Sequence, residues 1–250
     1  MSENYLILGA SSEVGTAFIR DLNRKNAGNN QQEITVVAHY RKRNHIFDAV
    51  IKESANLNVH AVCADLSEQE QVMELLQQTE IIEGCPTHIL HLPAEKLCYE
   101  KLKKSDFSRV TQNFGIQTGS LFLTLQKFLP MMAKNRYGKI VVMLSSVTIG
   151  MPPAYMTDYT INKYALLGLI KSAAVEYGDK GININGISPS MMETKFLEQV
   201  NEKIIALSAE TSKIKRNITV EEVLPTIHYL FSEASDYMNG TNINLSGGDC

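Results

Sequence analysis

Three side chains, those of Ser146, Tyr159 and Lys163, have the types and spacing of a proton-transfer site. Tyr159 and Lys163 stand at positions i and i+4 in a stretch with helical periodicity, so both leave one face of a helix. A phenol with its ordinary pKa of about 10 is a weak acid, and a neighbouring ammonium is expected to lower that pKa. Ser146 follows an apolar run that predicts a buried strand, and its hydroxyl could hold a carbonyl oxygen. Together these groups could protonate a developing alkoxide.

The spacing of the Tyr–Lys pair is weak evidence by itself, because Tyr99 and Lys103 repeat it in a charged stretch. Such a pair is ordinarily found on a solvated helix surface. The pair at Tyr159 differs in its setting, since a strand ending in two serines precedes it and a glycine-rich turn lies near the start of the chain.

Short apolar runs alternate with stretches of helical periodicity along the whole chain. Strands are predicted at residues 5–8, 34–38, 58–63, 89–92, 140–144, 182–187 and 241–245. Helices are predicted after the glycine-rich turn, at 46–55, 68–78 and 105–133, around Tyr159 up to 177, and from a capping box at Thr219 and Glu222 to 231, with a surface loop at 26–32. This order predicts an α/β protein, a single-domain Rossmann fold over residues 1–250. Its doubly wound, mostly parallel seven-stranded sheet would carry helices on both faces.

The turn after the first predicted strand is typical of a dinucleotide site. Gly9 and Gly15 let the backbone turn sharply and approach a pyrophosphate, whose charge the following helix N-terminus would meet. The second strand is followed by Arg41, Lys42 and Arg43, with no carboxylate to bind a ribose 2′-hydroxyl. We therefore predict NADP(H), with Arg41 making a forked contact to the 2′-phosphate; a solvated basic loop is the alternative.

Composition excludes several other classes of protein. A net charge of −3 and a pI near 6.1 give no reason to expect nucleic acid as a partner. No apolar run approaches the roughly 18 residues of a membrane span, and the N-terminus does not look like a signal peptide. Neither the four cysteines (Cys63, Cys85, Cys98 and Cys250) nor the six histidines have ligand spacing, so we expect no metal site, reduced thiols and a cytoplasmic location.

With these residues in place, the sequence resembles the classical short-chain dehydrogenase/reductase family over nearly its whole length. Within that family it looks most like the 3-oxoacyl-[acyl-carrier-protein] reductases. The landmarks that match in order and spacing are the turn from Gly9 to Gly15, Asp65, Asn113, Ser146, Tyr159, Lys163 and the segment from Ser188-Pro189 to Thr194.

The resemblance implies a role for each matched position. Tyr159 would be the general acid in carbonyl reduction, and Ser146 would bind the substrate oxygen. Lys163 would bind the nicotinamide ribose and lower the pKa of Tyr159, while Asn113 would hold a water that relays protons past Lys163. The cofactor would contact Gly9, Ser11, Ser12, Glu13, Val14, Gly15, Arg41, Asp65, Leu66, Pro93, Ala94, Tyr159, Lys163, Pro189, Met192 and Thr194.

The sequence departs from the family pattern around the cofactor. Glu13 stands where the family usually has its second glycine, and the segment from Leu92 to Glu95 replaces the usual Asn-Asn-Ala-Gly. Ser190 replaces a glycine after Pro189. We expect Glu13 to point to solvent, where a carboxylate at a helix N-terminus is favourable. These departures bear on cofactor affinity more than on the proton-transfer residues.

The substrate site is predicted to be apolar and adaptable, lined by Val147, Tyr155, Met191 and Phe196. Core packing is an equally good explanation for the methionines. Arg136 and Lys180 match positions where the 3-oxoacyl reductases carry basic residues that dock an acidic carrier protein, although cations at helix ends are common as solvated caps.

The residues and the resemblance together predict an NADPH-dependent carbonyl reductase acting on a 3-oxoacyl thioester or a related ketone, free or carried by a protein. An NADP-dependent alcohol or sugar dehydrogenase is one alternative. A non-catalytic dinucleotide-binding protein with an altered glycine turn is another. The resemblance implies a homodimer or homotetramer assembled through the helices at about 105–133 and 158–177.

Overall fold

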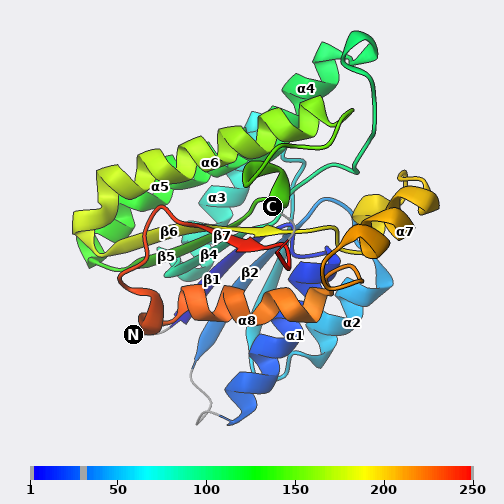
Figure 1. The fold of residues 1–250 in the computed structure, drawn as a ribbon. Coiled ribbons are helices and arrows are strands. Elements are labelled where there is room, and N and C mark those ends of the chain that lie inside the picture. Colours follow the sequence, from blue (N-terminus) through cyan, green and yellow to red (C-terminus); the bar gives the residue numbers. More distant parts are fainter. Residues whose placement is uncertain (1–2, 29–32, 249–250) are drawn as a thin grey trace.

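Seven strands form one parallel sheet in the order β3-β2-β1-β4-β5-β6-β7 (Figure 1). The computed structural model describes residues 3–28 and 33–248. The strands are β1 (Glu3–Leu8), β2 (Ile34–Tyr40), β3 (Asn58–Cys63), β4 (His88–His91), β5 (Gly138–Met143), β6 (Ile182–Pro189) and β7 (Asn242–Leu245). Every residue of β4 and β5 is buried, as expected for central strands of a sheet covered on both faces. The predicted fold is confirmed, and within the described residues all six strand pairings are parallel.

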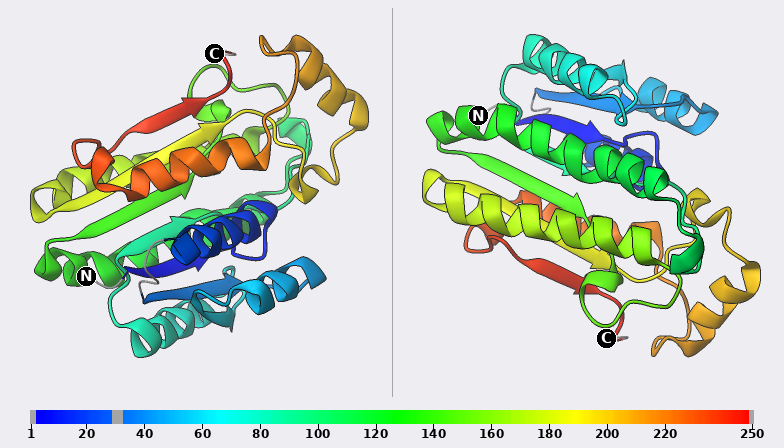
Figure 2. Two further views of the ribbon diagram at one scale, coloured as in Figure 1. Left: turned by 90° about the horizontal axis from the view of Figure 1, so that it is seen from below. Right: turned by 90° about the horizontal axis from the view of Figure 1, so that it is seen from above.

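Helices cover both faces of the sheet (Figure 2). One face packs against α1 (Glu13–Gly28), α2 (His45–Glu53) and α8 (Val220–Phe231), through a core that includes Phe18, Phe47 and Ile227. The other packs against α3 (Gln69–Glu83), α5 (Ser120–Asn135) and α6 (Thr157–Tyr177), through a core that includes Phe128 and Ile170. These two apolar layers hold the helices against the sheet, and the sheet determines where the carboxyl ends of its strands lie.

The direction of winding reverses between β1 and β4. From β1 the chain runs outward through β2 and β3, then crosses back to pair β4 with the other side of β1. In doubly wound sheets the crevice at this switch point, at the carboxyl ends of the strands, is where ligands bind. Residues that follow β1, β2, β4, β5 and β6 therefore converge at one edge of the sheet.

The predicted elements differ from the observed ones mainly just before α5, at the end of α1 and between β6 and α8. The helix expected at 105–133 is interrupted: α4 (Phe107–Phe114) runs into a π-helical segment, Gly115–Gly119, before α5 begins. The loop expected at 26–32 is partly wrong, because α1 continues to Gly28; residues 29–32 lie outside the described residues. Helix α7 (Glu202–Thr211) was not predicted. The capping box of Thr219 and Glu222 is confirmed at the start of α8.

Candidate active site

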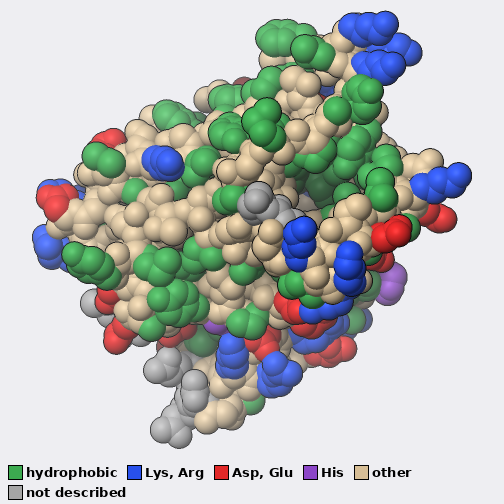
Figure 3. All heavy atoms as spheres, viewed as in Figure 1, with side chains coloured by type: hydrophobic (Ala, Val, Ile, Leu, Met, Phe, Trp, Pro, Cys, Tyr) green, Lys and Arg blue, Asp and Glu red, His purple; other side chains and the backbone are tan. Residues whose placement is uncertain are grey.

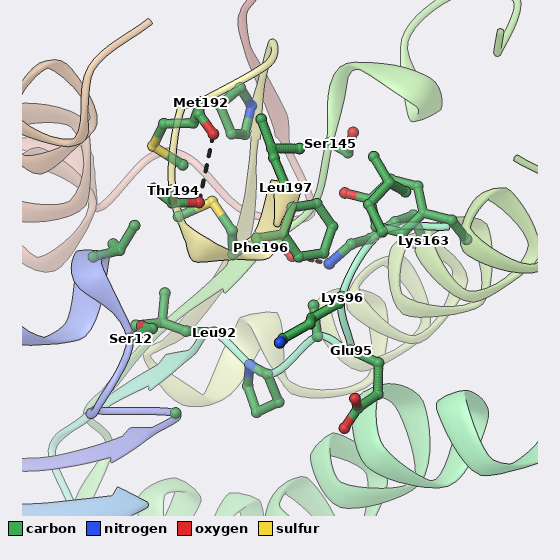
Figure 4. Close-up of a pocket in the computed structure, with 18 of the residues that line it drawn as sticks. Ser12, Leu92, Glu95, Lys96, Ser145, Lys163, Met192, Thr194, Phe196 and Leu197 are labelled. Atoms are coloured by element: carbon green, nitrogen blue, oxygen red, sulfur yellow. Dashed lines mark hydrogen bonds between the residues drawn. The ribbon is translucent and has the colours of Figure 1, made fainter. Parts of the chain in front are cut away.

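A cavity of about 790 Å³ opens at the carboxyl edge of the sheet, at the switch point. Its walls come from the β1–α1 turn, the ends of β2 and β5, the segment after β4, helix α6 and the segment after β6. In Figure 3 the surface is hollowed between the tip that projects beside α4 and the region of α7. Figure 4 shows Ser145 and Lys163 on one side of the cavity and Ser12 on another.

Tyr159 and Lys163 both line this cavity from the first turns of α6. The Lys163 side chain is buried, and its Nζ donates a hydrogen bond of 2.8 Å to the carbonyl oxygen of Met143 at the end of β5. Its Nζ lies 5.6 Å from the centre of the Tyr159 ring. The helix therefore presents the phenol and the amine together, as their spacing predicted.

The electrostatics of this pair differ from the prediction. Burial raises the pKa of Tyr159 to about 12, although a hydrogen bond with Ser145 acts in the opposite direction. Burial also lowers the pKa of Lys163 to about 7, so the lysine is only partly charged at neutral pH. The expected lowering of the tyrosine pKa is therefore wrong for this structure, and Tyr159 keeps its proton.

The serine that forms a hydrogen bond with Tyr159 is Ser145, next to the predicted Ser146, and both serines line the cavity. Strand β5 ends at Met143, and Ser145 is the N-cap of the short 3₁₀ turn Ser146–Thr148. Ser146 is the first residue of that turn, and it lines the cavity beside Ser145. Spacing along the sequence could not separate adjacent serines, because the geometry of the turn decides which one faces the tyrosine.

Asn113 is buried near the end of α4 and does not line the cavity. The next side-chain amide, that of Gln117, is in the π-helical segment, which packs against α6. Gln117 is 2% exposed, and its carbonyl oxygen accepts no hydrogen bond from the described residues. Single π-helical turns are frequent at functional sites. The sequence analysis did not predict this π-helical segment, although the glycines at positions 115 and 119 were a signal that the helix could deform there.

The glycine-rich turn has the tight geometry that a dinucleotide requires. Gly9 has a φ of +79°, which an L side chain rarely adopts, and a Cβ on Gly15 would lie 2.6 Å from the carbonyl oxygen of Ala10. Ser12 accepts a hydrogen bond from the Gly15 N–H at 3.1 Å. Ser12, Glu13 and Val14 line the cavity at the start of α1, where first-turn N–H groups have no partner within the helix.

Glu13 was predicted to point to solvent, but its side chain lines the cavity. Its carboxylate accepts a hydrogen bond of 3.0 Å from the backbone N–H of Lys195, which belongs to the segment after β6, and it lines the cavity. The partner lies 182 positions away along the chain, so the contact could not be read from local sequence. Glu13 thus joins two walls of the cavity.

The cations after β2 are divided between the cavity and the surface. Arg41 and Lys42 line the cavity, and the Arg41 guanidinium forms an ion pair with Glu95 from the segment after β4. Arg43 instead stacks on the Tyr40 ring, with its guanidinium carbon 5.2 Å from the ring centre. His39, which was not predicted, accepts a 3.0 Å hydrogen bond from the Gly9 N–H and holds the glycine turn against β2.

Most residues of the predicted site are brought together by the fold. The cavity is lined by Gly9, Ser11, Ser12, Glu13, Val14, Arg41, Asp65, Leu66, Pro93, Ala94, Ser146, Val147, Tyr159, Lys163, Pro189, Met191, Met192, Thr194 and Phe196. Gly15, Asn113 and Tyr155 are outside its lining. Tyr155 is 52% exposed, and its carbonyl accepts a hydrogen bond of 2.8 Å from the Glu100 N–H, so it supports the neighbouring segment, and its substrate role stays a prediction.

An apolar cluster closes the part of the cavity beside Tyr159. It contains Leu97, Val147, Met156, Leu197 and Val200, with Tyr99, Met191 and Phe196 packed against it. The rings of Phe196 and Tyr159 are 5.6 Å apart between centres. Leu97 and Tyr99 were missed, because the segment after β4 has no regular pattern that would predict which way its side chains point.

Arg136 and Lys180 lie at the opposite end of the sheet, directly before β5 and β6. Arg136 donates to the carbonyl oxygen of Asp179 at 3.3 Å, and Lys180 pairs with the Asp179 carboxylate at 2.6 Å. Because parallel strands begin at one edge and end at the other, these cations cannot guide a partner to the cavity of their own chain. The docking role of this pair stays a prediction, and within one chain the pair and the cavity lie at opposite edges of the sheet.

Comparison with known proteins identifies the family. A family model described as "Enoyl-(Acyl carrier protein) reductase" matches residues 27–249. The chain belongs to this family of short-chain dehydrogenase/reductases. Similar relatives include 3-oxoacyl-[acyl-carrier-protein] reductase FabG of Rickettsia bellii, 24% identical over 250 residues, which cover 97% of this chain and 95% of the relative. FabG of Thermotoga maritima is 26% identical over 248 residues, which cover 97% and 96% of the two chains.

Solved structures of short-chain reductases share the fold. Levodione reductase superposes with a TM-score of 0.87 at 23% identity, over 99% of this chain and 97% of that one. YwfH, described as an NADPH-dependent reductase involved in bacilysin biosynthesis, gives a TM-score of 0.84 at 19% identity, over 100% and 99%. At these identities the likeness establishes the architecture of this family member and leaves its substrate open.

The described residues show neither a metal cluster nor a membrane-spanning helix. They contain no group of three or more His, Cys, Asp or Glu side chains that could hold a metal ion. Within residues 3–28 and 33–248, no helix is long and apolar enough to cross a membrane. Cys250 lies outside the described residues, and the other three cysteines are free.

Proposed function

We propose that this member of the family is an NADPH-dependent carbonyl reductase. The observation that carries the proposal is the placement of Tyr159 beside Ser145 and Lys163 in a cavity that continues to the glycine-rich turn. A phenol that keeps its proton is suited to donate it, which favours the reductive direction.

The residues around the cavity fit a dinucleotide. The β1–α1 turn offers helix N–H groups to a pyrophosphate, and Arg41 and Lys42 offer positive charge where a 2′-phosphate would lie. Lys163 would hold the nicotinamide ribose, with Pro189, Met192 and Thr194 beside the ring. The bound cofactor would supply the hydride.

The proton-transfer residues then complete the reaction. Ser145 donates a hydrogen bond to the carbonyl oxygen of the substrate and orients it toward Tyr159. As the carbonyl carbon gains a hydride, the C–O π electrons move to oxygen, which takes the proton of the Tyr159 hydroxyl. The product is an alcohol, and Lys163 helps to restore the proton of Tyr159 because its pKa is about 7.

The substrate that the cavity favours is an apolar ketone. Its wall beside Tyr159 is built from Val147, Met191, Phe196 and the apolar cluster around them. Two relatives bear the name 3-oxoacyl-[acyl-carrier-protein] reductase, which supports a 3-oxoacyl thioester, free or carried by a protein. We also propose a homodimer or homotetramer that uses α5 and α6, where Phe122 is 52% exposed and Ile161 is 48% exposed.

One observation favours a second candidate, a dinucleotide-binding protein without catalytic activity. Glu13 and Glu95 place two carboxylates in the cavity where they oppose an anionic cofactor. The proton-transfer residues argue for the enzyme, since a binding module has no use for a phenol beside an amine. An alcohol dehydrogenase working in the oxidative direction would use the same residues in reverse.

The test is the Tyr159→Phe variant, assayed for NADPH-dependent reduction of a panel of ketones and 3-oxoacyl thioesters. Loss of the proton donor should reduce turnover by about 100-fold or more, with little change in the dissociation constant of NADPH. Tyr164→Phe on the same helix is the matched control, because this tyrosine is 45% exposed and does not line the cavity. Full turnover in Tyr159→Phe would refute the mechanism, and NADPH binding without turnover of any ketone by the unaltered protein would favour the second candidate.

A further inference from the structure

One ion pair crosses the cofactor side of the cavity, between Arg41 at the end of β2 and Glu95 after β4. These residues are 54 positions apart in the sequence, and β1 separates the two strands that carry them. Their side chains are 45% and 31% exposed, so the pair lies in the cavity wall where a ligand can reach it. Figure 4 shows Glu95 on the segment that follows Leu92 and borders the cavity.

The Glu95 carboxylate is paired with the Arg41 guanidinium, which is the group that would bind a 2′-phosphate. A guanidinium binds a carboxylate or a phosphate through the same forked set of N–H donors, so the two anions compete for Arg41. The other nearby carboxylate, that of Asp65, accepts hydrogen bonds from the N–H and hydroxyl of Ser67 at 3.0 and 2.8 Å through one oxygen. The Ser67 hydrogen bonds and the charge of Arg41 lower the pKa of Asp65, but within the described residues Asp65 forms no ion pair with Arg41. Lys42 also lines the cavity and has no ion pair with the described residues.

We propose that Glu95 is a specificity-determining residue that limits the preference for NADP(H) over NAD(H). The inference rests on the proposed function, because it assumes that Arg41 meets the 2′-phosphate. NADPH must exchange the Arg41–Glu95 contact for an Arg41–phosphate contact and leave the Glu95 carboxylate beside a second anion. NADH carries a hydroxyl at this position, so the ion pair stays in place when NADH binds.

Glu13 supplies a matched control for this argument. It is also a carboxylate that lines the cavity, but its partner is the backbone N–H of Lys195, and it stands at the start of α1. The pyrophosphate expected there is common to NADPH and NADH. Glu13→Gln should therefore change the affinities for both cofactors by the same factor, whereas Glu95→Gln should change only one.

The experiment measures dissociation constants of NADPH and NADH by fluorescence titration, for the unaltered chain and for Glu95→Gln, Arg41→Ala, the double variant and Glu13→Gln. Glu95→Gln should tighten NADPH binding by about three- to tenfold and leave NADH within about twofold, since the pair is partly exposed. In the Arg41→Ala background the same substitution should have a clearly smaller effect on NADPH, because the competition for the guanidinium is gone.

Several results would overturn the inference, and they differ from a failure of the proposed function. If Glu95→Gln strengthened the binding of NADPH and NADH equally, Glu95 would repel both anionic cofactors and would not discriminate between them. Weaker NADPH binding would make it a residue that orients Arg41, and weaker NADH binding alone would make it a ligand of the ribose hydroxyl. If Glu95→Gln strengthened NADPH binding just as much in the Arg41→Ala background, Glu95 and the 2′-phosphate would not compete for Arg41. If no variant binds either cofactor, the proposed function itself fails, and the inference with it.

Discussion

Replacing Ser145 by alanine should reduce ketone turnover about 100- to 1000-fold, whereas Ser146→Ala should leave turnover within about threefold. Of the two adjacent serines, Ser145 is the one whose hydrogen bond acts on the pKa of Tyr159, so we expect its hydroxyl to bind the oxygen that receives the proton. Removal of one such donor from a site where negative charge develops costs a factor of this size.

The structural cost of Ser145→Ala should be small. The contact that Ser145 makes as an N-cap, from the Val147 N–H to its Oγ, is long at 3.4 Å. Its loss should lower the free energy of unfolding by about 0.5–1 kcal/mol, which a thermal melt can verify.

The assay for both serine variants follows NADPH consumption at saturating cofactor, with NADPH dissociation constants measured in parallel. Those constants should stay within about twofold of the unaltered protein, because the serine hydroxyl acts on the substrate. If Ser146→Ala abolished turnover and Ser145→Ala left it unaffected, the argument from the turn geometry would be refuted. Ser146, the residue predicted from sequence spacing, would then be the serine that binds the substrate oxygen.

Three further predictions follow from the packing and the buried polar groups. Gly15→Ala should weaken the binding of NADPH and NADH alike and lower the free energy of unfolding by about 1–3 kcal/mol, because its Cβ would lie 2.6 Å from the Ala10 carbonyl oxygen. Fluorescence titration measures the first effect and a thermal melt the second. Unchanged affinity for both cofactors would contradict the role given to this turn in binding the cofactor. Burial raises the pKa of Glu83 from its ordinary 4.5 to about 8, so the native state holds a proton that the unfolded chain releases, and stability should fall as pH rises from about 4.5 to 8. Glu83→Gln should remove this loss of stability and raise the free energy of unfolding at pH 8 by on the order of 2 kcal/mol. If urea unfolding of the variant has the same pH dependence as that of the unaltered protein, the prediction is wrong. Asn113→Leu should lower turnover about tenfold with unchanged NADPH affinity, because the resemblance gives Asn113 the proton relay past Lys163; unchanged turnover would contradict that role.

Much of the fold could be predicted because its signals are local. Each strand is a short apolar or β-branched run, and the capping box at Thr219 and Glu222 marks a helix start by itself. The interruption between α4 and α5 could not be placed in the same way, since a π-helical turn keeps the composition of a helix. The end of α3 was placed at residue 78 instead of Glu83 for a similar reason, because helical periodicity does not mark where a helix stops.

The sequence by itself determined the order of the elements, the glycine-rich turn and the helical spacing of Tyr159 and Lys163, because these depend on neighbours within a few residues. Only the tertiary structure decided that Ser145 meets the phenol, that Glu13 binds the Lys195 N–H and that Glu95 binds Arg41. The last two of these contacts join segments that the parallel sheet brings to one edge from distant parts of the chain, 182 and 54 positions apart. The pKa values of Tyr159 and Lys163 likewise follow from burial in the folded protein, which the spacing of two residues cannot express.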